Sequence, residues 1–172
     1  MKRLIAIALL LLMLPGLWAC AQEKELVYPI AYHYLRAPLP NGQIAHGSAD
    51  SLIGTELREG DGYQQDPSWL LDLYLHGPLD RSYRTPFPVG TSLRQLIVED
   101  SGATVVLSRQ FAKLTGADLS LACGCLTLTV MDLTGAESVT ILVEGALLDG
   151  KESITMDKTN LILVDNAIPD ME

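Results

Sequence analysis

Apolar and polar residues alternate along the start of the chain in two segments that predict a β-ribbon. Residues 26–36 have strand character, with β-branched and aromatic residues spaced through the segment. Residues 51–58 predict a second strand, which ends at the turn-forming cluster Glu-Gly-Asp-Gly. Pro29 interrupts the first segment, and a proline suits an edge strand or the first residues of a strand. We therefore expect the two segments to pair as an antiparallel ribbon.

The clearest helix signal lies between two dipeptides that contain proline. Asp66 and Pro67 predict the start of the helix, because aspartate caps a helix N-terminus and proline fits the first helical position. Gly77, which a proline follows, predicts its end. Four residues at helical spacing are expected to pack on a sheet: Trp69, Leu70, Leu73 and Tyr74.

A hairpin is predicted in the middle of the chain. Residues 93–99 and 103–108 read as its strands, and the Asp-Ser-Gly between them suits a tight turn. Period-two alternation places four residues on its inward face: Leu96, Val98, Val105 and Leu107.

The last part of the chain predicts a long helix followed by strands. The helix covers about residues 118–133 and ends at a Thr-Gly pair. Residues 139–144 predict a β-branched strand, and an Asp-Gly turn precedes a final pair of strands at 154–156 and 161–164. The order is ribbon, helix, hairpin, helix and strand.

The long helix and one hairpin strand carry more apolar surface than one buried face requires. The helix has a stripe of Leu119, Ala122, Leu126, Val130 and Leu133, with Leu121, Cys123, Cys125 and Leu128 on its other faces. Such a helix is either sandwiched within the protein or docked on a neighbour. Val106 makes its strand apolar on both faces, so it is either covered by the C-terminal strands or exposed for a partner. Val106, Leu121 and Leu128 are therefore the candidate interaction surface.

The first nineteen residues predict a secretory signal peptide. A basic start leads into an apolar run that is too short to span a membrane, and Ala19 precedes Cys20. Leu17, Ala19 and Cys20 resemble the lipobox of bacterial lipoproteins, from which Trp18 departs. We expect a diacylglycerol on the Cys20 thiol, whose acyl chains, palmitate for example, would anchor the protein at the extracytoplasmic face of the cell membrane. An ordinary secretory signal that happens to end in cysteine is the alternative.

Composition and charge indicate one folded domain that does not bind nucleic acid. We expect a signal peptide at 1–19, a lipidated tether at 20–25, the domain at 26–165 and a flexible tail at 166–172. The chain is 48% hydrophobic and 19% charged, with a formal net charge of −9. Removing residues 1–19 takes away two of the 12 basic residues and leaves 10 against 21 acidic ones, a charge of −11. An acidic body repels phosphates, which argues against nucleic acid and anionic lipid head groups.

Catalytic and metal-binding patterns are missing from the sequence. It contains no nucleophile elbow, no zinc-protease motif and no phosphate loop. On a helix, Cys123 and Cys125 point about 200° apart, so we interpret them as small apolar residues packed around Gly124. The histidines lie in unrelated segments: His33, His46 and His76. We therefore expect no enzyme activity, no cofactor and no metal.

Several short segments occur in an order that carries a family resemblance. They are residues 75–78 (Leu-His-Gly-Pro), 88–93, 100–108 with Phe111, 121–122 leading to 133–135, and 138–145. Their order and separations resemble one copy of the GerM (sporulation and spore germination) domain, covering most of residues 26–165. The resemblance implies an α/β (α+β) domain of αββαβ order, similar to ring-building motifs, with helices on a small mixed sheet after the ribbon.

The resemblance also implies a function without catalysis. Such domains occur on lipoproteins of Gram-positive bacteria, and the family offers no catalytic residues. We expect an interaction module that assembles with itself or with envelope proteins in sporulation or germination. The alternative is a lipoprotein that binds a small ligand or the cell wall and assists a membrane sensor. Four aromatic residues would line the pocket of such a receptor: Tyr32, Tyr34, Trp69 and Tyr74.

Overall fold

The structure is a computed structural model that describes residues 26–38 and 52–165. The predicted signal peptide, tether, first long loop and tail lie outside the described residues. The described elements occur in the order β1, β2, α2, β3, β4, β5, η2, α3, β6, β7 and α4. Within this order, α2, β4, β5, α3 and β6 reproduce the predicted succession of helix, two strands, helix and strand.

The ribbon forms as predicted and gains a short third strand. β1 (Pro29–Arg36) pairs antiparallel with β2 (Ile53–Glu59) from Pro29 opposite Glu59 to Leu35 opposite Ile53. β3 (Tyr83–Arg84) pairs with the end of β1 on its other edge. Pro29 is the first residue of β1, where its missing N–H costs no ladder hydrogen bond.

The helix α2 (Pro67–Leu75) begins where the sequence predicts. The Asp66 carboxylate accepts a hydrogen bond of 2.9 Å from the Trp69 N–H, and Gly77 adopts a positive φ of 100° after the helix. The expected packing of Trp69 was wrong. Its ring is 40% exposed and stacks on Tyr63 at 3.8 Å between ring centroids. The buried residues of the helix are Leu70, Leu71, Tyr74 and Leu75.

A second, mixed sheet has the order β4, β5, β6, β7. β4 (Leu93–Val98) and β5 (Gly102–Leu107) form the predicted antiparallel hairpin. β6 (Ser138–Val143) runs parallel to β5, and β7 (Ser153–Asp157) runs antiparallel to β6. The expected inward position of Val98 agrees with its pairing to the buried Ala103, but its side chain is 46% exposed because it lies at the end of the sheet near the hairpin turn.

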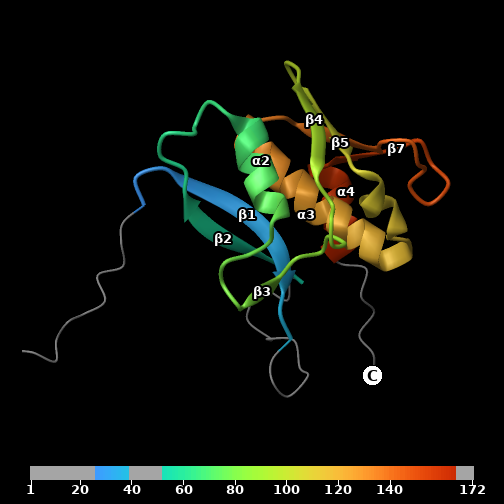
Figure 1. The fold of residues 1–172 in the computed structure, drawn as a ribbon, viewed down its shortest axis with the longest axis horizontal. Helices are drawn as coiled ribbons and strands as arrows, with labels where there is room; N and C mark the ends of the chain where they lie inside the picture. The colour runs from blue at the N-terminus through green and yellow to red at the C-terminus, as the bar shows by residue number, and fades with distance from the viewer. Residues whose placement is uncertain (1–25, 39–51, 166–172) are drawn as a thin grey trace, which may run out of the picture.

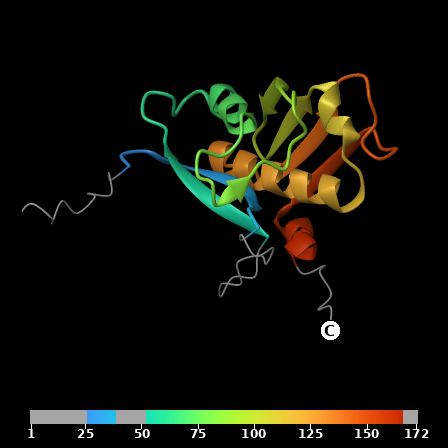
Figure 2. The same ribbon diagram turned by 60° about the horizontal axis from the view of Figure 1, so that its bottom comes forward.

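The long helix α3 (Gly116–Thr134) lies between the two sheets (Figures 1 and 2). It contacts β1 on one side and the inner faces of β5, β6 and β7 on the other, and it ends at Gly135 with a φ of 75°. A Cβ atom on Gly124 would lie 3.3 Å from Leu161 and 3.5 Å from Ile53. This close approach supports the interpretation of Cys123 and Cys125, both buried and free, as core residues.

The edge of β1 that faces α3 is closed by two hydroxyl groups. The His33 N–H donates to the Thr129 Oγ1 at 2.9 Å, and the Tyr74 hydroxyl donates to the His33 carbonyl at 2.6 Å. Thus the helix side chains take the place of a neighbouring strand, and they join the first sheet to the rest of the core.

The final segment corrects one expectation. Residues 161–164 were expected to form a strand, but Lys158–Asp165 is the helix α4. The Asp157 carboxylate accepts hydrogen bonds from the N–H groups of Thr159 and Asn160 at 2.8 and 3.0 Å, which is the pattern of a capped helix start. The short helix η2 (Arg109–Lys113) buries Phe111 beside the same core.

Candidate functional site

The four-stranded sheet has two unlike faces, and the described helices contact only the inner one. Inner side chains such as Val105 and Ile141 are fully buried. By the alternation and register of the strands, the outer face carries Gln95, Ile97, Thr104, Val106, Ser138, Thr140, Leu142, Ser153, Thr155 and Asp157. Of these ten residues only Asp157, which stands opposite Ser138 at one end of the face, is charged. Ile97 is 40% exposed, and the hydroxyls of Thr140 and Thr155 lie 2.9 Å apart.

Val106 lies at the centre of this outer face. Its strand, β5, is hydrogen-bonded to β4 and β6, so the backbone of β5 offers no free edge. Val106 stands opposite Gln95 on one side and Leu142 on the other, and its side chain is half-buried. The sequence found this residue but not its surroundings, because the parallel neighbour β6 comes some 35 residues later in the chain.

The two helix residues of the predicted surface lie on α3. Leu121 and Leu128 are each partly buried, and Leu128 packs against the core. The helix is sandwiched within the protein. Among the described residues it is the one helix long and apolar enough to cross a membrane, and 56% of its apolar window is buried. Val106 and the two leucines lie on opposite sides of the sheet, so the structure does not bring the three together.

The aromatic pocket expected of a receptor is not formed. Tyr32, Tyr34 and Tyr74 are at most 1% exposed, and their rings pack together in the core. Trp69 lies apart from them on the surface. Cys20, the predicted lipidation site, lies outside the described residues.

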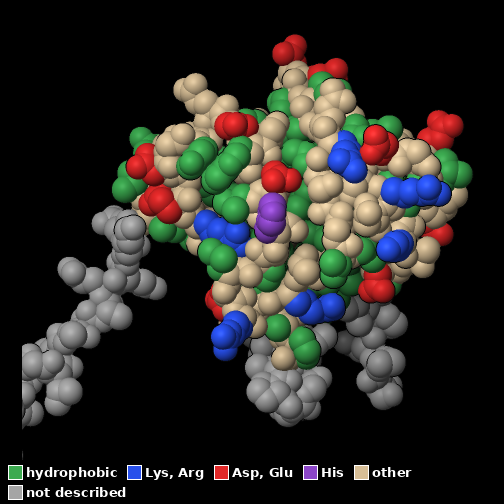
Figure 3. Space-filling model, in the orientation of Figure 1, with side chains coloured by type: hydrophobic (Ala, Val, Ile, Leu, Met, Phe, Trp, Pro, Cys, Tyr) green, Lys and Arg blue, Asp and Glu red, His purple; other side chains and the backbone are tan. Residues whose placement is uncertain are grey.

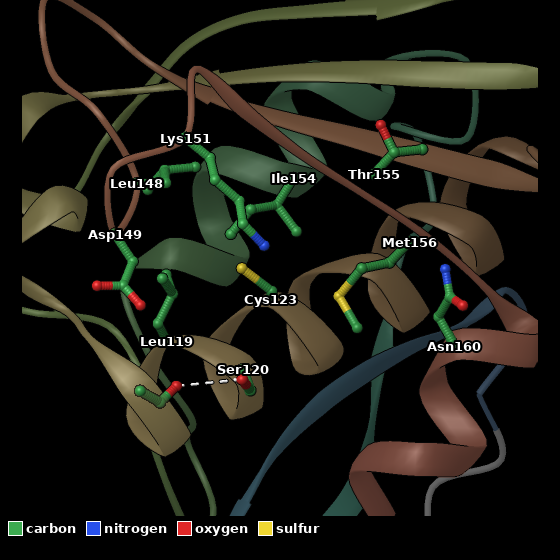
Figure 4. Close-up of a pocket in the computed structure, with 11 residues that line it drawn as sticks. Leu119, Ser120, Cys123, Leu148, Asp149, Lys151, Ile154, Thr155, Met156 and Asn160 are labelled. Carbon is green, nitrogen blue, oxygen red and sulfur yellow. Dashed lines mark hydrogen bonds between the residues drawn. The ribbon is translucent and has the colours of Figure 1, made fainter.

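A different pocket of about 360 Å³ lies between the start of α3 and β7 (Figure 4). Its lining consists of Gly116, Leu119, Ser120, Cys123, Leu148, Asp149, Lys151, Ile154, Thr155, Met156 and Asn160. The apolar part of this lining comes from α3 and from the inner residues of β7. The polar part comes mainly from the turn before β7 and from the start of α4.

A tight turn holds the charged residues of this pocket. Leu148 and Lys151 exchange two backbone hydrogen bonds of 2.8 and 3.0 Å across Asp149 and Gly150. Asp149 is the one non-glycine residue of the described chain with a positive φ, 49°, and Gly150 follows at 82°. This pair of left-handed residues is typical of a two-residue hairpin turn. The turn sets Leu148 and Lys151 on the same side, next to the pocket.

The chemistry of the pocket is that of a binding site. Burial raises the pKa of the Cys123 thiol to about 12, so the thiol is neutral and a poor nucleophile at ordinary pH. The Lys151 ammonium, by contrast, has no hydrogen bond or ion pair to any described residue. The Ser120 hydroxyl is already bonded to the Gly116 carbonyl at 3.1 Å.

One further cluster joins a hydroxyl, an imidazole and a carboxylate. His33 Nε2 lies 2.8 Å from Asp132 Oδ2, and its Nδ1 lies 3.2 Å from the Thr55 hydroxyl. The two partners lie on α3 and β2, so the contacts link the ribbon to the helix. Sequence analysis missed this cluster, because 99 positions separate His33 from Asp132 and no motif marks the pair. Within the described ranges, no three His, Cys, Asp or Glu side chains converge as metal ligands.

Comparison with known proteins identifies a matching family and solved structures with a similar fold. The sequence model of the Germane family, described as sporulation and spore germination, matches residues 51–149. The first GerMN domain of the Bacillus subtilis sporulation protein GerM superposes with a TM-score of 0.51 and 16% identity, covering 69% of this chain and 84% of that domain. The tandem GerMN domains of the same protein give a TM-score of 0.50 and 18% identity, covering 74% of this chain and 44% of the tandem.

A structure from Clostridium perfringens that is described as a putative lipoprotein gives a TM-score of 0.48 and 16% identity, covering 77% of this chain and 89% of that one. No curated protein matches the sequence. The fold is therefore that of a GerMN-type mixed α and β domain. Since the family match spans more than half of the chain, the protein belongs to the Germane family of sporulation and spore germination domains. The resemblance predicted from the sequence is confirmed.

Proposed function

We propose that this protein is a lipid-anchored, extracytoplasmic interaction module that binds an envelope protein during sporulation or germination. The observation that carries the proposal is the outer face of the four-stranded sheet, which is uncharged except for Asp157 at its end. The rest of the molecule is acidic, with a net charge of −9. In the view of Figure 3, charged side chains of both signs are dispersed over the surface. An outer face on which nine of ten residues are uncharged, with Asp157 at its end, contrasts with this, and the cores of protein interfaces are depleted in charge.

A partner of a different kind fits this face better than a second copy. A high net charge of one sign opposes the association of identical chains, because every copy carries the same excess of carboxylates. The composition of the face, threonine with Ile97, Val106 and Leu142, offers hydroxyls and aliphatic groups in place of charges. Membership of the Germane family supports a role in sporulation or germination.

The proposal assigns no catalytic step to the protein. The Cys123 thiol is neutral, and the His33 cluster bridges two elements of the core. Attachment to the membrane is proposed through Cys20, because the net charge of −9 opposes binding of the protein to anionic lipid head groups.

Site-specific photo-crosslinking in the native host tests the interaction. A photoreactive phenylalanine analogue is placed at Ile97, on the outer face, and at Val89, which is 98% exposed in the loop before β4. We expect starvation-dependent adducts with extracytoplasmic envelope proteins from position 97 and none from position 89. Equal adducts from both positions, or adducts with only a second copy of this chain, would contradict the proposal.

The anchor is tested separately by fractionation. Cys20→Ser removes the proposed acylated thiol, and the protein should move from the membrane fraction to a soluble or uncleaved form. Cys123→Ser serves as the matched control, because that cysteine lies in the core, and it should leave the membrane fraction unchanged. Retention of the Cys20→Ser protein with normal processing would refute lipid anchoring.

A further inference from the structure

We propose that the pocket between α3 and β7 binds a small aliphatic carboxylate, with the carboxylate on the Lys151 ammonium and the hydrocarbon part against Leu119 and Met156. This binding role goes beyond the proposed interaction through the outer face, and neither depends on the other. The two sites lie on opposite faces of the sheet, and Thr155, on the edge strand β7, is the one residue that they share.

The size and lining of the pocket suit a small organic molecule. Its volume of about 360 Å³ falls at the lower end of the range of ligand sites, roughly 300–1,000 Å³. Leu119 and Cys123 from α3 face Ile154 and Met156 from β7, so the inner part is apolar (Figure 4). An apolar interior with few polar groups at its mouth is the usual pattern of such sites.

The charge that orients the ligand comes from Lys151. In Figure 4 its ammonium points toward Cys123, into the space between α3 and β7. It has no hydrogen bond or ion pair to any described residue, although 21 of the 172 residues are acidic. An ammonium held over an apolar floor, without an internal partner, is suited to a charge-assisted hydrogen bond with an anion.

The remaining polar groups restrict the class of ligand. Lys151 is the one basic residue of the lining, so a single negative charge matches the site better than a phosphate dianion does. Asp149 lies at the turn beside Leu119, where its carboxylate would disfavour a second negative charge (Figure 4). The neutral Cys123 thiol forms no covalent bond with the ligand, because its pKa of about 12 leaves almost no thiolate.

The backbone holds this arrangement in place. Paired hydrogen bonds between Leu148 and Lys151 fix the turn, and the Asp157 cap fixes the start of α4 beside it. The positive φ of Asp149 is a conformation that non-glycine residues rarely adopt. The turn therefore holds the Lys151 backbone in one place beside the apolar lining of the pocket, while the long, exposed side chain can reach a ligand there.

Methyl NMR on the full chain in lipid nanodiscs tests the site. Methionine methyl groups are labelled with ¹³C. Met156 on β7 lines the pocket, and Met131, a buried residue of α3 outside the lining, serves as the internal control. The probe is sodium 4-methylpentanoate, and isoamylamine is the matched probe without a carboxylate. We expect 4-methylpentanoate to shift the Met156 signal with saturation and to leave the Met131 signal in place.

Two lysine variants decide whether the charge matters. Lys151→Gln should weaken the binding of 4-methylpentanoate about tenfold, whereas Lys113→Gln, which removes a charge outside the pocket, should leave it unchanged. L-leucine as a third probe identifies the source of the carboxylate. Binding as tight as that of 4-methylpentanoate indicates an amino acid, and weaker binding indicates a simple acid. The proposal is overturned if Met156 does not respond, if isoamylamine binds equally well, or if Lys151→Gln binds as the unchanged protein does.

Discussion

Glu56 and Arg58, two positions apart on β2, form a buried ion pair with 3.1 Å between a carboxylate oxygen and a guanidinium nitrogen. Both side chains are 8% exposed. Arg58 also donates to the Gly77 carbonyl at 2.7 Å, and Glu56 accepts from the Leu79 N–H at 3.1 Å. The pair therefore ties β2 to the segment that follows α2, and its hydrogen-bonding groups are satisfied by that segment.

Removing one partner of this pair should destabilise the fold strongly. Arg58→Met leaves the Glu56 carboxylate buried without its cation, which costs about 3–5 kcal/mol. Urea denaturation followed by circular dichroism measures the loss. The double variant Glu56→Gln with Arg58→Met is the control, and it should recover part of the stability. If the free energy of unfolding of Arg58→Met lies within 1 kcal/mol of that of the unchanged protein, the ion pair does not stabilise the fold as we describe.

The buried hydroxyl of Tyr32 leads us to expect that the protein loses stability at high pH. Burial raises its pKa to about 12, and its hydroxyl donates to the Leu70 carbonyl at 2.9 Å. The folded pKa is above the unfolded value, so the stabilisation is present below about pH 10 and is lost as the pH rises toward 12. Tyr32→Phe should cost about 1 kcal/mol near neutral pH and should flatten this alkaline decline.

Absorbance at 295 nm, recorded between pH 9 and pH 13, follows the ionisation. Tyr63, which is 45% exposed, provides a surface tyrosine for comparison through the variant Tyr63→Phe. The explanation fails if Tyr32→Phe and Tyr63→Phe change the alkaline unfolding curve equally.

The close contacts around Gly124 predict that a large side chain is not tolerated where α3 crosses α4 and β2. Gly124→Ala should change stability by less than about 1 kcal/mol, because the gain in helix propensity opposes a contact at 3.3 Å with a flexible leucine methyl. Gly124→Leu should cost roughly 1–3 kcal/mol or more by overpacking. Thermal unfolding of both variants distinguishes the cases, and equal stability of the alanine and leucine variants would show that the crossing has spare room.

Asp157 predicts a weakening of α4 in acid. The Thr159 hydroxyl and the Asn160 N–H lower the pKa of its carboxyl group. The folded pKa is below the unfolded one, so the stabilisation is present above about pH 3.9 and is lost as the pH falls through the folded value. Asp157→Ala should abolish this dependence. Hydrogen exchange of the first α4 amides at pH 3 and pH 6 measures it, and a pH effect retained by the variant would contradict the assignment.

The sequence predicted those parts of the fold that depend on local signals. Pro29, Asp66 and the glycines that end α2 and α3 act through their own backbone preferences, so the bounds of these elements needed no tertiary information. Residues 161–164 were expected to be a strand because their apolar run is ambiguous. The Asp157 cap that favours a helix lies four residues before this run, outside the apolar pattern on which the prediction depends.

The surfaces and sites were less predictable, because they depend on which segments meet. Val106 was found from its apolar neighbours, yet only the parallel pairing of β5 with β6 shows that it sits on a face and not at an edge. Tyr32, Tyr34 and Trp69 have the same aromatic character in the sequence. The first two are buried and the third is exposed, and nothing local distinguishes them. The orientation of Lys151 follows from a two-residue turn. The Asp-Gly pair predicts that turn, but it does not predict which side chains the turn places beside the pocket.

The contact between His33 and Thr129 joins two residues 96 positions apart, so it can form only after most of the chain has been made. The chain is made from its N-terminus, so β1 and β2 exist before the Thr129 hydroxyl that accepts from the His33 N–H. Until α3 has been made, that strand keeps an open edge and an uncovered apolar side, which is the condition under which strands join wrong partners.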